Sequence, residues 1–117
     1  MSLLSTISKP ADRSVICTIT GDAGTGKTTL GATFPKPIFI RIEDGLQAVP
    51  EEIRPDALPV ISKVDQFWEQ LTALITEPHP YKTVVIDSIT QLETLFAEYV
   101  IANDPKQPKS LAQANGG

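Results

Sequence analysis

The segment GDAGTGKT, at residues 21–28, limits the folds open to this 117-residue chain more than any other. Its three spaced glycines permit main-chain conformations closed to residues with a β-carbon, so successive N–H groups can converge on one anion. The apolar run 15–20 precedes the segment directly, and a short helix is predicted after it, at residues 27–34. The pattern therefore predicts an anion-binding loop between a strand and the first turn of a helix.

The spacing Gly-x-x-x-x-Gly-Lys-Thr is that of the Walker A loop, which binds nucleotide phosphates. Lys27 is expected to reach the β and γ phosphates of ATP, and the Thr28 hydroxyl is expected to coordinate Mg²⁺. The predicted cofactor-binding residues make up the whole loop: Gly21, Asp22, Ala23, Gly24, Thr25, Gly26, Lys27, Thr28 and Thr29.

Two further apolar runs end in carboxylates, which a nucleotide site needs for its metal and for its attacking water. The run 83–86 is followed by Asp87, as in a Walker B strand, so Asp87 is the predicted second metal ligand. Ser88 stands where many ATPases have a catalytic glutamate. The run 37–42 is followed by Glu43, and this makes Glu43 the predicted catalytic base. The alternatives are that Asp87 only terminates a strand and that Glu43 belongs to an acidic turn.

The pattern of apolar residues predicts an α/β fold with a parallel sheet flanked by helices. Two helices are indicated by stripes of apolar residues, and Phe67 and Trp68 in the first of them are expected in the core. Ser88 has the spacing to Gln91 that caps a helix. The predicted strands are 15–20, 37–42, 58–61 and 83–86, the predicted helices are 64–75 and 89–100, and residues 45–59 are expected to form a surface connection.

The length fits one domain, which we divide into a leader at residues 1–12, a nucleotide-binding core at 13–102 and an irregular segment at 103–117. The core is expected to be incomplete at the C-terminus. A net charge of −4 argues against general binding of polyanions, so any contact with nucleic acid must be local. The sequence shows no apolar run of membrane-spanning length and no signal peptide, which predicts a cytoplasmic protein without a membrane partner. Cys17 is expected to be buried in a strand.

These motifs resemble those of the RecA-like ATPases of the P-loop superfamily. The similarity rests on GDAGTGKTT at residues 21–29, FIRIEDG at 39–45 and VVIDS at 84–88. It implies that Lys27 and Glu43 are catalytic and that Glu43 activates water. More narrowly, the chain resembles phage-encoded ATP-binding proteins of recombination and strand annealing. That resemblance implies single-stranded DNA as a partner, homo-oligomers among the expected assemblies, and the host cytoplasm as the location.

One feature of the resemblance is missing from the sequence. RecA-like sheets place a later strand between the Walker A and Walker B strands, and no candidate for it follows Val100. The DNA-binding loops of the family also have no counterpart here, so no residue is assigned to DNA.

Three other functions remain open. A GTP-binding switch is suggested by Ser62-Lys63-Val64-Asp65, although this near match to Asn-Lys-x-Asp precedes the Walker B run instead of following it, and Asp65 is interpreted as a helix cap. A small-molecule kinase would also use a Walker A loop. A module that binds ATP to control assembly without hydrolysing it is the third alternative.

Overall fold

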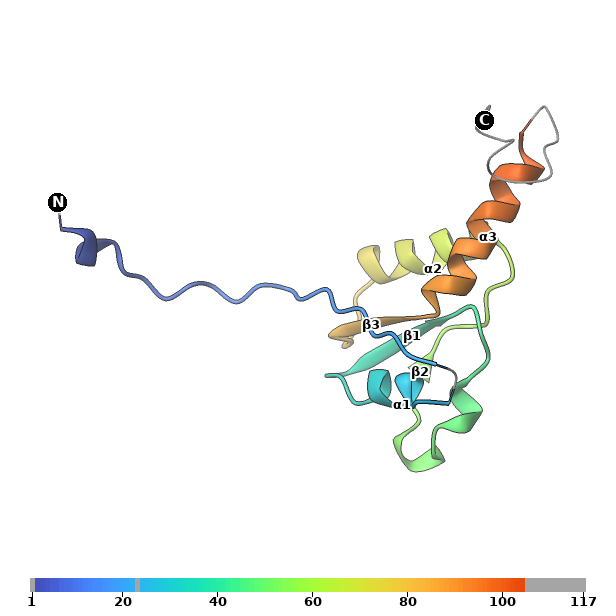
Figure 1. Cartoon of the computed structure of the whole chain (residues 1–117), viewed down its shortest axis with the longest axis horizontal. Helices are drawn as coiled ribbons and strands as arrows, with labels where there is room; N and C mark the ends of the chain where they lie inside the picture. Colours follow the sequence, from blue (N-terminus) through green and yellow to red (C-terminus); the bar gives the residue numbers. More distant parts are fainter. Residues whose placement is uncertain (1, 23, 105–117) are drawn as a thin grey trace.

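The computed structural model describes residues 2–22 and 24–104, and it contains a parallel sheet with helices on both faces. Figure 1 shows α2 and α3 on one side of the sheet and α1 on the other, with the N-terminal segment leading away from the sheet. The elements are η1 (Leu3–Thr6), α1 (Lys27–Ala32), β1 (Pro37–Arg41), η2 (Leu46–Ala48), η3 (Glu51–Ile53), β2 (Asp56–Ala57), α2 (Val64–Thr76), β3 (Thr83–Asp87) and α3 (Ile89–Ala102). Within the described ranges, each helix is too short or too polar to cross a bilayer.

The strand order is β2-β1-β3, and both pairings are parallel. The central strand β1 pairs with β3 over its whole length, from Pro37 opposite Thr83 to Arg41 opposite Asp87. Parallel pairing in this register brings the carboxyl ends of β1 and β3 to the same edge of the sheet. The predicted α/β fold with a buried parallel sheet is therefore confirmed.

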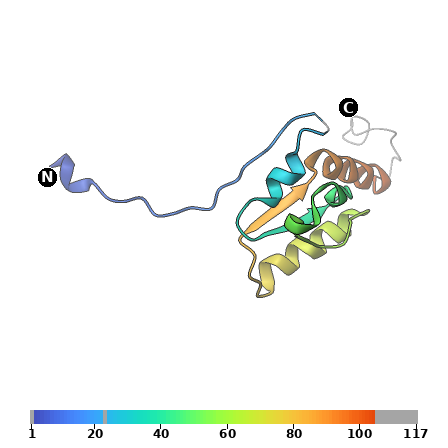
Figure 2. The same ribbon diagram turned by 90° about the horizontal axis from the view of Figure 1, so that it is seen from below.

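The sheet has a separate hydrophobic cluster on each face, because successive side chains of β1 point in opposite directions. Ile40 packs with Phe67 and Leu92 under α2 and α3. Phe39 packs with Leu46 and Val49 under α1 and η2, and Figure 2 shows these elements from that side. Both faces of the central strand are thus removed from water, as its continuous apolar sequence predicts.

The prediction of a strand at residues 15–20 is wrong, because the structure has no strand there. The run is extended but pairs with no strand, and Val15 and Ile16 are 86% and 97% exposed. Cys17, predicted to be buried, is exposed as well. The physical reason is that a strand needs a hydrogen-bonding neighbour. The resemblance requires an intervening strand between this run and β3, and no described residue takes that place.

Three smaller predictions also need correction. The strand predicted at 58–61 is found at Asp56–Ala57, although Ile61 still donates its N–H to the Arg41 carbonyl over 2.8 Å. The connection 45–59 is not only a surface loop, because it contributes two residues to the core. Trp68 is half exposed, since the α2 stripe that faces the sheet is centred on Phe67.

Both long helices begin close to where the sequence predicts. Ser88 caps α3 as expected, its Oγ accepting the Gln91 N–H over 3.3 Å. Asp65 is not the cap of α2, however. That position is held by Lys63, and the Gln66 side chain accepts the Lys63 N–H over 3.1 Å. Gln66 thus holds the residues that lead into α2, and Asp65 lies inside the helix.

Tyr81 links the segment before β3 to the start of β2. Its hydroxyl donates to Asp56 Oδ2 over 2.6 Å. This hydrogen bond is the largest cause of a raised pKa of Tyr81, and burial and the negative charge of Asp56 raise the pKa further. A raised pKa means that the folded chain holds the phenol proton more tightly, so the contact stabilises the fold at neutral pH and is lost as the pH rises through the pKa of the folded state.

We expect Tyr81 to ionise above its ordinary pKa of 10.0 in an absorbance titration of the folded chain. Tyr81→Phe should remove the ionisation step that lies above this value. Asp56→Asn should lower that step, because it removes the negative charge beside the phenol. An unchanged high-pH step in Tyr81→Phe would contradict the assignment.

Candidate functional site

The glycine loop has the conformation that its sequence predicts at two of its three glycines. Gly24 and Gly26 have φ angles of 81° and 91°, in the left-handed region that residues with a β-carbon rarely adopt. Gly26 is the N-cap of α1, so the helix begins at Lys27. Thr25 closes the turn, its hydroxyl donating to the Asp22 carbonyl over 2.9 Å. Ala23, which the sequence places in the same loop, lies outside the described residues.

Lys27 folds back over the loop that precedes it. Its Nζ donates to the carbonyl oxygens of Gly21 and of Asp22, the latter over 2.9 Å. The side chain is half buried, as are those of Thr28 and Thr29, which follow it in the first turn of α1. The ammonium group thus lies against the main chain of the glycine loop.

Thr28 and Asp87 meet, although 59 positions separate them in the sequence. The Thr28 hydroxyl donates to Asp87 Oδ2 over 3.0 Å. The contact depends on a close approach of α1 to the sheet, where a β-carbon on Gly31 would lie 3.2 Å from a Val85 methyl carbon and 3.3 Å from the Phe39 ring. Glycine at position 31 therefore helps to place the first turn of α1 at the end of β3.

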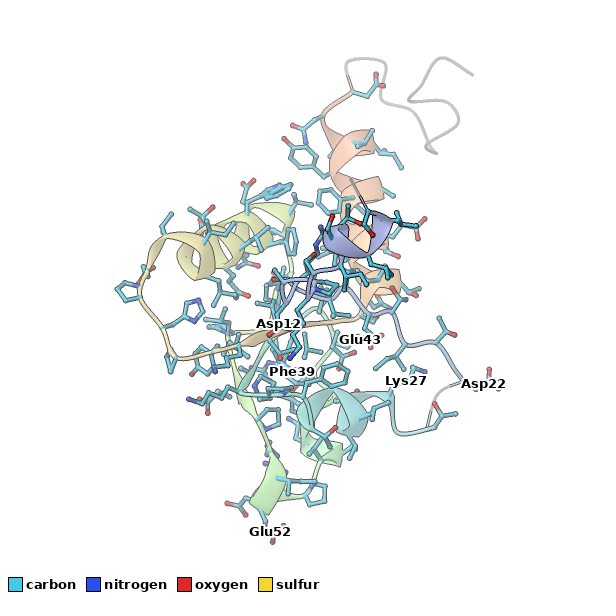
Figure 3. The ribbon with its side chains drawn as sticks, turned by 90° about the vertical axis from the view of Figure 1, so that its left-hand side faces the viewer. Asp12, Asp22, Lys27, Phe39, Glu43 and Glu52 are labelled. Carbon is cyan, nitrogen blue, oxygen red and sulfur yellow. The ribbon has the colours of Figure 1, made fainter. Side chains whose placement is uncertain are left out.

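Glu43 lies at the same edge of the sheet, in the turn that follows β1. The main-chain N–H groups of Ile42 and Glu43 both donate to the Asp87 carbonyl, over 2.7 Å and 3.2 Å. The Glu43 carboxylate itself is exposed. In Figure 3, Glu43 and Lys27 lie on the same side of the molecule. The structure thus brings the main chain of the predicted base to the predicted metal ligand.

The residues that hold this turn in shape could not be recognised from the sequence motifs. Arg41 Nη1 lies 3.1 Å from Asp44 Oδ1, and Arg41 Nε donates to the Leu58 carbonyl over 3.1 Å. Gln47 Nε2 donates to the other oxygen of Asp44 over 3.0 Å. An arginine ending a strand three positions before an aspartate was the available signal. These contacts fix the path of the chain through Glu43.

The Thr28 and Asp87 oxygens suit a magnesium ion. Mg²⁺ takes six oxygen ligands at about 2.0–2.1 Å, which sets neighbouring ligands about 2.9 Å apart. Thr28 Oγ1 and Asp87 Oδ2 are 3.0 Å apart, so the two oxygens are close enough to contact one ion. Among the described residues no group of three or more His, Cys, Asp or Glu gathers as a metal cluster. One hydroxyl and one carboxylate suit a Mg²⁺ whose other ligands are phosphate and water.

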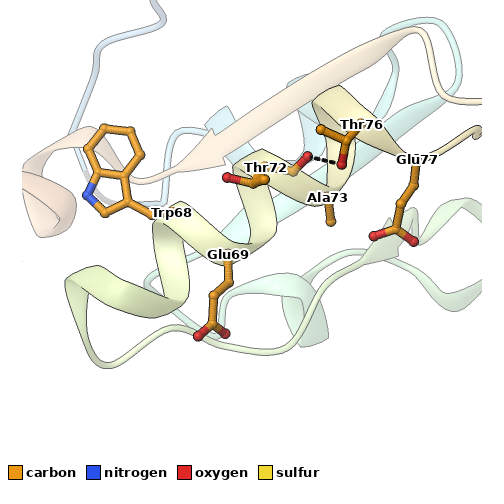
Figure 4. A pocket seen from close by; sticks show the side chains of 6 residues that line it. All are labelled: Trp68, Glu69, Thr72, Ala73, Thr76 and Glu77. Atoms are coloured by element: carbon orange, nitrogen blue, oxygen red, sulfur yellow. Dashed lines mark hydrogen bonds between the residues drawn. The ribbon is translucent and has the colours of Figure 1, made fainter.

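A shallow hollow on the surface lies elsewhere. It runs along the outer face of α2, as Figure 4 shows, and contains no residue of the glycine loop, of the Glu43 turn or of the end of β3. It is open to solvent, and its floor is made of Thr72, Ala73 and Thr76 between Trp68 and the carboxylates of Glu69 and Glu77. Nothing in its chemistry identifies a ligand, so we assign it no function.

These features together define the class of P-loop NTPases. They are a parallel sheet, a glycine loop, a lysine and a threonine that open a helix, and an aspartate at the end of a strand. A family model described as AAA domain (AAA_24) matches residues 13–116. This is most of the chain, and the chain therefore belongs to that AAA domain family of nucleotide-binding ATPases. Among curated proteins and among solved structures, none matches the chain significantly.

Proposed function

We propose that the chain binds ATP with Mg²⁺ and hydrolyses it. The observation that carries the proposal is the meeting of Thr28 Oγ1 with Asp87 Oδ2 beside the glycine loop, at the strand edge where Glu43 lies. In this proposal the amides of loop 21–29 and Lys27 hold the triphosphate. Thr28 and Asp87 hold the metal, which supplies charge stabilisation when it is bound.

Glu43 would orient and deprotonate the attacking water. A general base must come within hydrogen-bonding reach of the proton that it removes, and the turn that carries Glu43 is fastened to Asp87 by main-chain hydrogen bonds. The carboxylate is exposed and has no hydrogen-bond partner in the described structure, so it is available to a water molecule beside the γ phosphate. The RecA-like pattern of the motifs supports the same assignment.

The proposed use of the hydrolysis is work on single-stranded DNA, in phage recombination or annealing. This part rests on the resemblance of the three motifs to phage-encoded ATP-binding proteins, and with it come the proposals of a cytoplasmic location and of homo-oligomers. Binding of ATP would then change the conformation at the strand edge, and the change would pass to DNA or to a second subunit.

The test is phosphate release from Mg-ATP, measured with and without single-stranded DNA, with Lys27→Ala as the blank. We expect turnover above the blank, increased by DNA. Binding of ATP without turnover would favour a module that controls assembly. Preference for GTP, or phosphate transfer to a small molecule in place of water, would favour the switch or the kinase. Turnover that ignores DNA would contradict the proposed partner while leaving the ATPase intact.

A further inference from the structure

Gly45 brings a third main-chain segment to the Thr28 and Asp87 oxygens. A β-carbon on Gly45 would lie 3.8 Å from Thr28 Oγ1 and 3.9 Å from Asp87 Oδ2, so the glycine faces both oxygens at once. These two oxygens are the nearest atoms to that β-carbon position outside the adjoining residues. The residue belongs to the turn of Glu43 and is the N-cap of η2.

The turn that carries this glycine is held from several sides. Arg41 and Gln47 each donate to one oxygen of Asp44, and the Glu43 N–H donates to the Asp87 carbonyl. Because these contacts fix the turn, a side chain added at position 45 could not simply move away from the two oxygens.

The backbone does not require a glycine here. Gly45 has φ −99° and ψ −1°, which any L-residue can adopt, whereas Gly24 and Gly26 have positive φ angles. The distances from the added β-carbon are ordinary van der Waals contacts, so alanine would also fit the chain without a bound metal. The missing side chain therefore leaves space beside the two oxygens that neither the backbone conformation nor the packing requires.

We infer that Gly45 keeps open the ligand positions of the magnesium ion beside Thr28 and Asp87. This inference rests on the proposed function, in which these two residues hold the metal of Mg-ATP. The remaining ligands of the ion are phosphate and water oxygens, which would lie about 2.9 Å from the protein oxygens next to them. A methyl group at position 45, less than 4 Å from both protein oxygens, would crowd any such ligand on its side of the ion.

The experiment compares the dissociation constant of a fluorescent, non-hydrolysable ATP analogue in excess Mg²⁺ and in EDTA. The ratio of the two constants measures how much the metal contributes, independently of turnover. For Gly45→Ala we expect this ratio to shrink by roughly tenfold, as for other changes beside metal ligands. The constant in EDTA should stay near that of the wild type, which also shows that the loop is folded.

Gln47→Ala is the matched control, because it loosens the same turn without adding an atom near the oxygens. We expect it to keep the wild-type ratio. An unchanged ratio in Gly45→Ala, or an equal loss in Gln47→Ala, would overturn the inference while leaving the proposed function in place. A wild-type chain that binds the analogue equally well in Mg²⁺ and in EDTA would overturn both.

Discussion

Replacing Lys27 by alanine should weaken ATP binding by about 10- to 100-fold, the effect of losing one or two charge-assisted hydrogen bonds. In the structure the ammonium group lies against the glycine loop, bonded to the Gly21 and Asp22 carbonyls. In the proposed complex it would exchange these neutral acceptors for phosphate oxygens that carry negative charge. Calorimetric titration with ATP measures the loss directly.

Lys82→Ala is the matched control, since it removes the same charge at the opposite edge of the sheet, just before β3 begins. It should bind ATP like the wild type. Equal losses in the two variants would mean that only net charge matters, and wild-type affinity in Lys27→Ala would contradict the assignment of the loop.

Much of the fold could be predicted because local patterns carried the information. The continuous apolar run that became β1 predicts a strand buried on both faces, and Ile38, Phe39 and Ile40 are buried. The stripe along α2 and the cap of α3 follow from residues three or four positions apart, which interact within one helix.

The failures concern interactions that no local sequence pattern encodes. The run 15–20 has the composition of a strand, but composition does not supply the neighbour that a strand requires. In the connection 45–59, Leu46 and Val49 are buried because η2 folds onto Phe39, and no periodicity marks such a contact.

In the candidate site, too, some residues could be predicted from local sequence patterns and others could not. The motif residues Lys27, Thr28 and Asp87 were predicted from sequence because their chemistry fixes the spacing, and parallel pairing then brings Glu43 to the same edge. The support around them could not be predicted. The hydrogen bonds of Asp44 and the approach of Gly45 to the Thr28 and Asp87 oxygens depend on the path of one turn.

Glu43→Gln should lower ATP turnover by about 10²- to 10⁴-fold, the usual contribution of a general base, while ATP affinity changes little. Glutamine keeps the size of the side chain and removes the charge that accepts a proton. Because the Glu43 carboxylate is exposed, its neutralisation should leave the fold intact. Single-turnover phosphate release and equilibrium ATP binding, measured on the same variant, separate the two effects.

The neighbouring Asp44 gives the sharpest control for this prediction. Asp44→Asn removes the same charge from the same turn, but its carboxylate is engaged by Arg41 and Gln47 rather than free to meet water. We therefore expect it to lose far less activity than Glu43→Gln. Similar losses in both variants would trace the effect to the shape or charge of the turn. Full turnover in Glu43→Gln would mean that another group activates the water, and the closeness of Glu43 to Asp87 would then be structural.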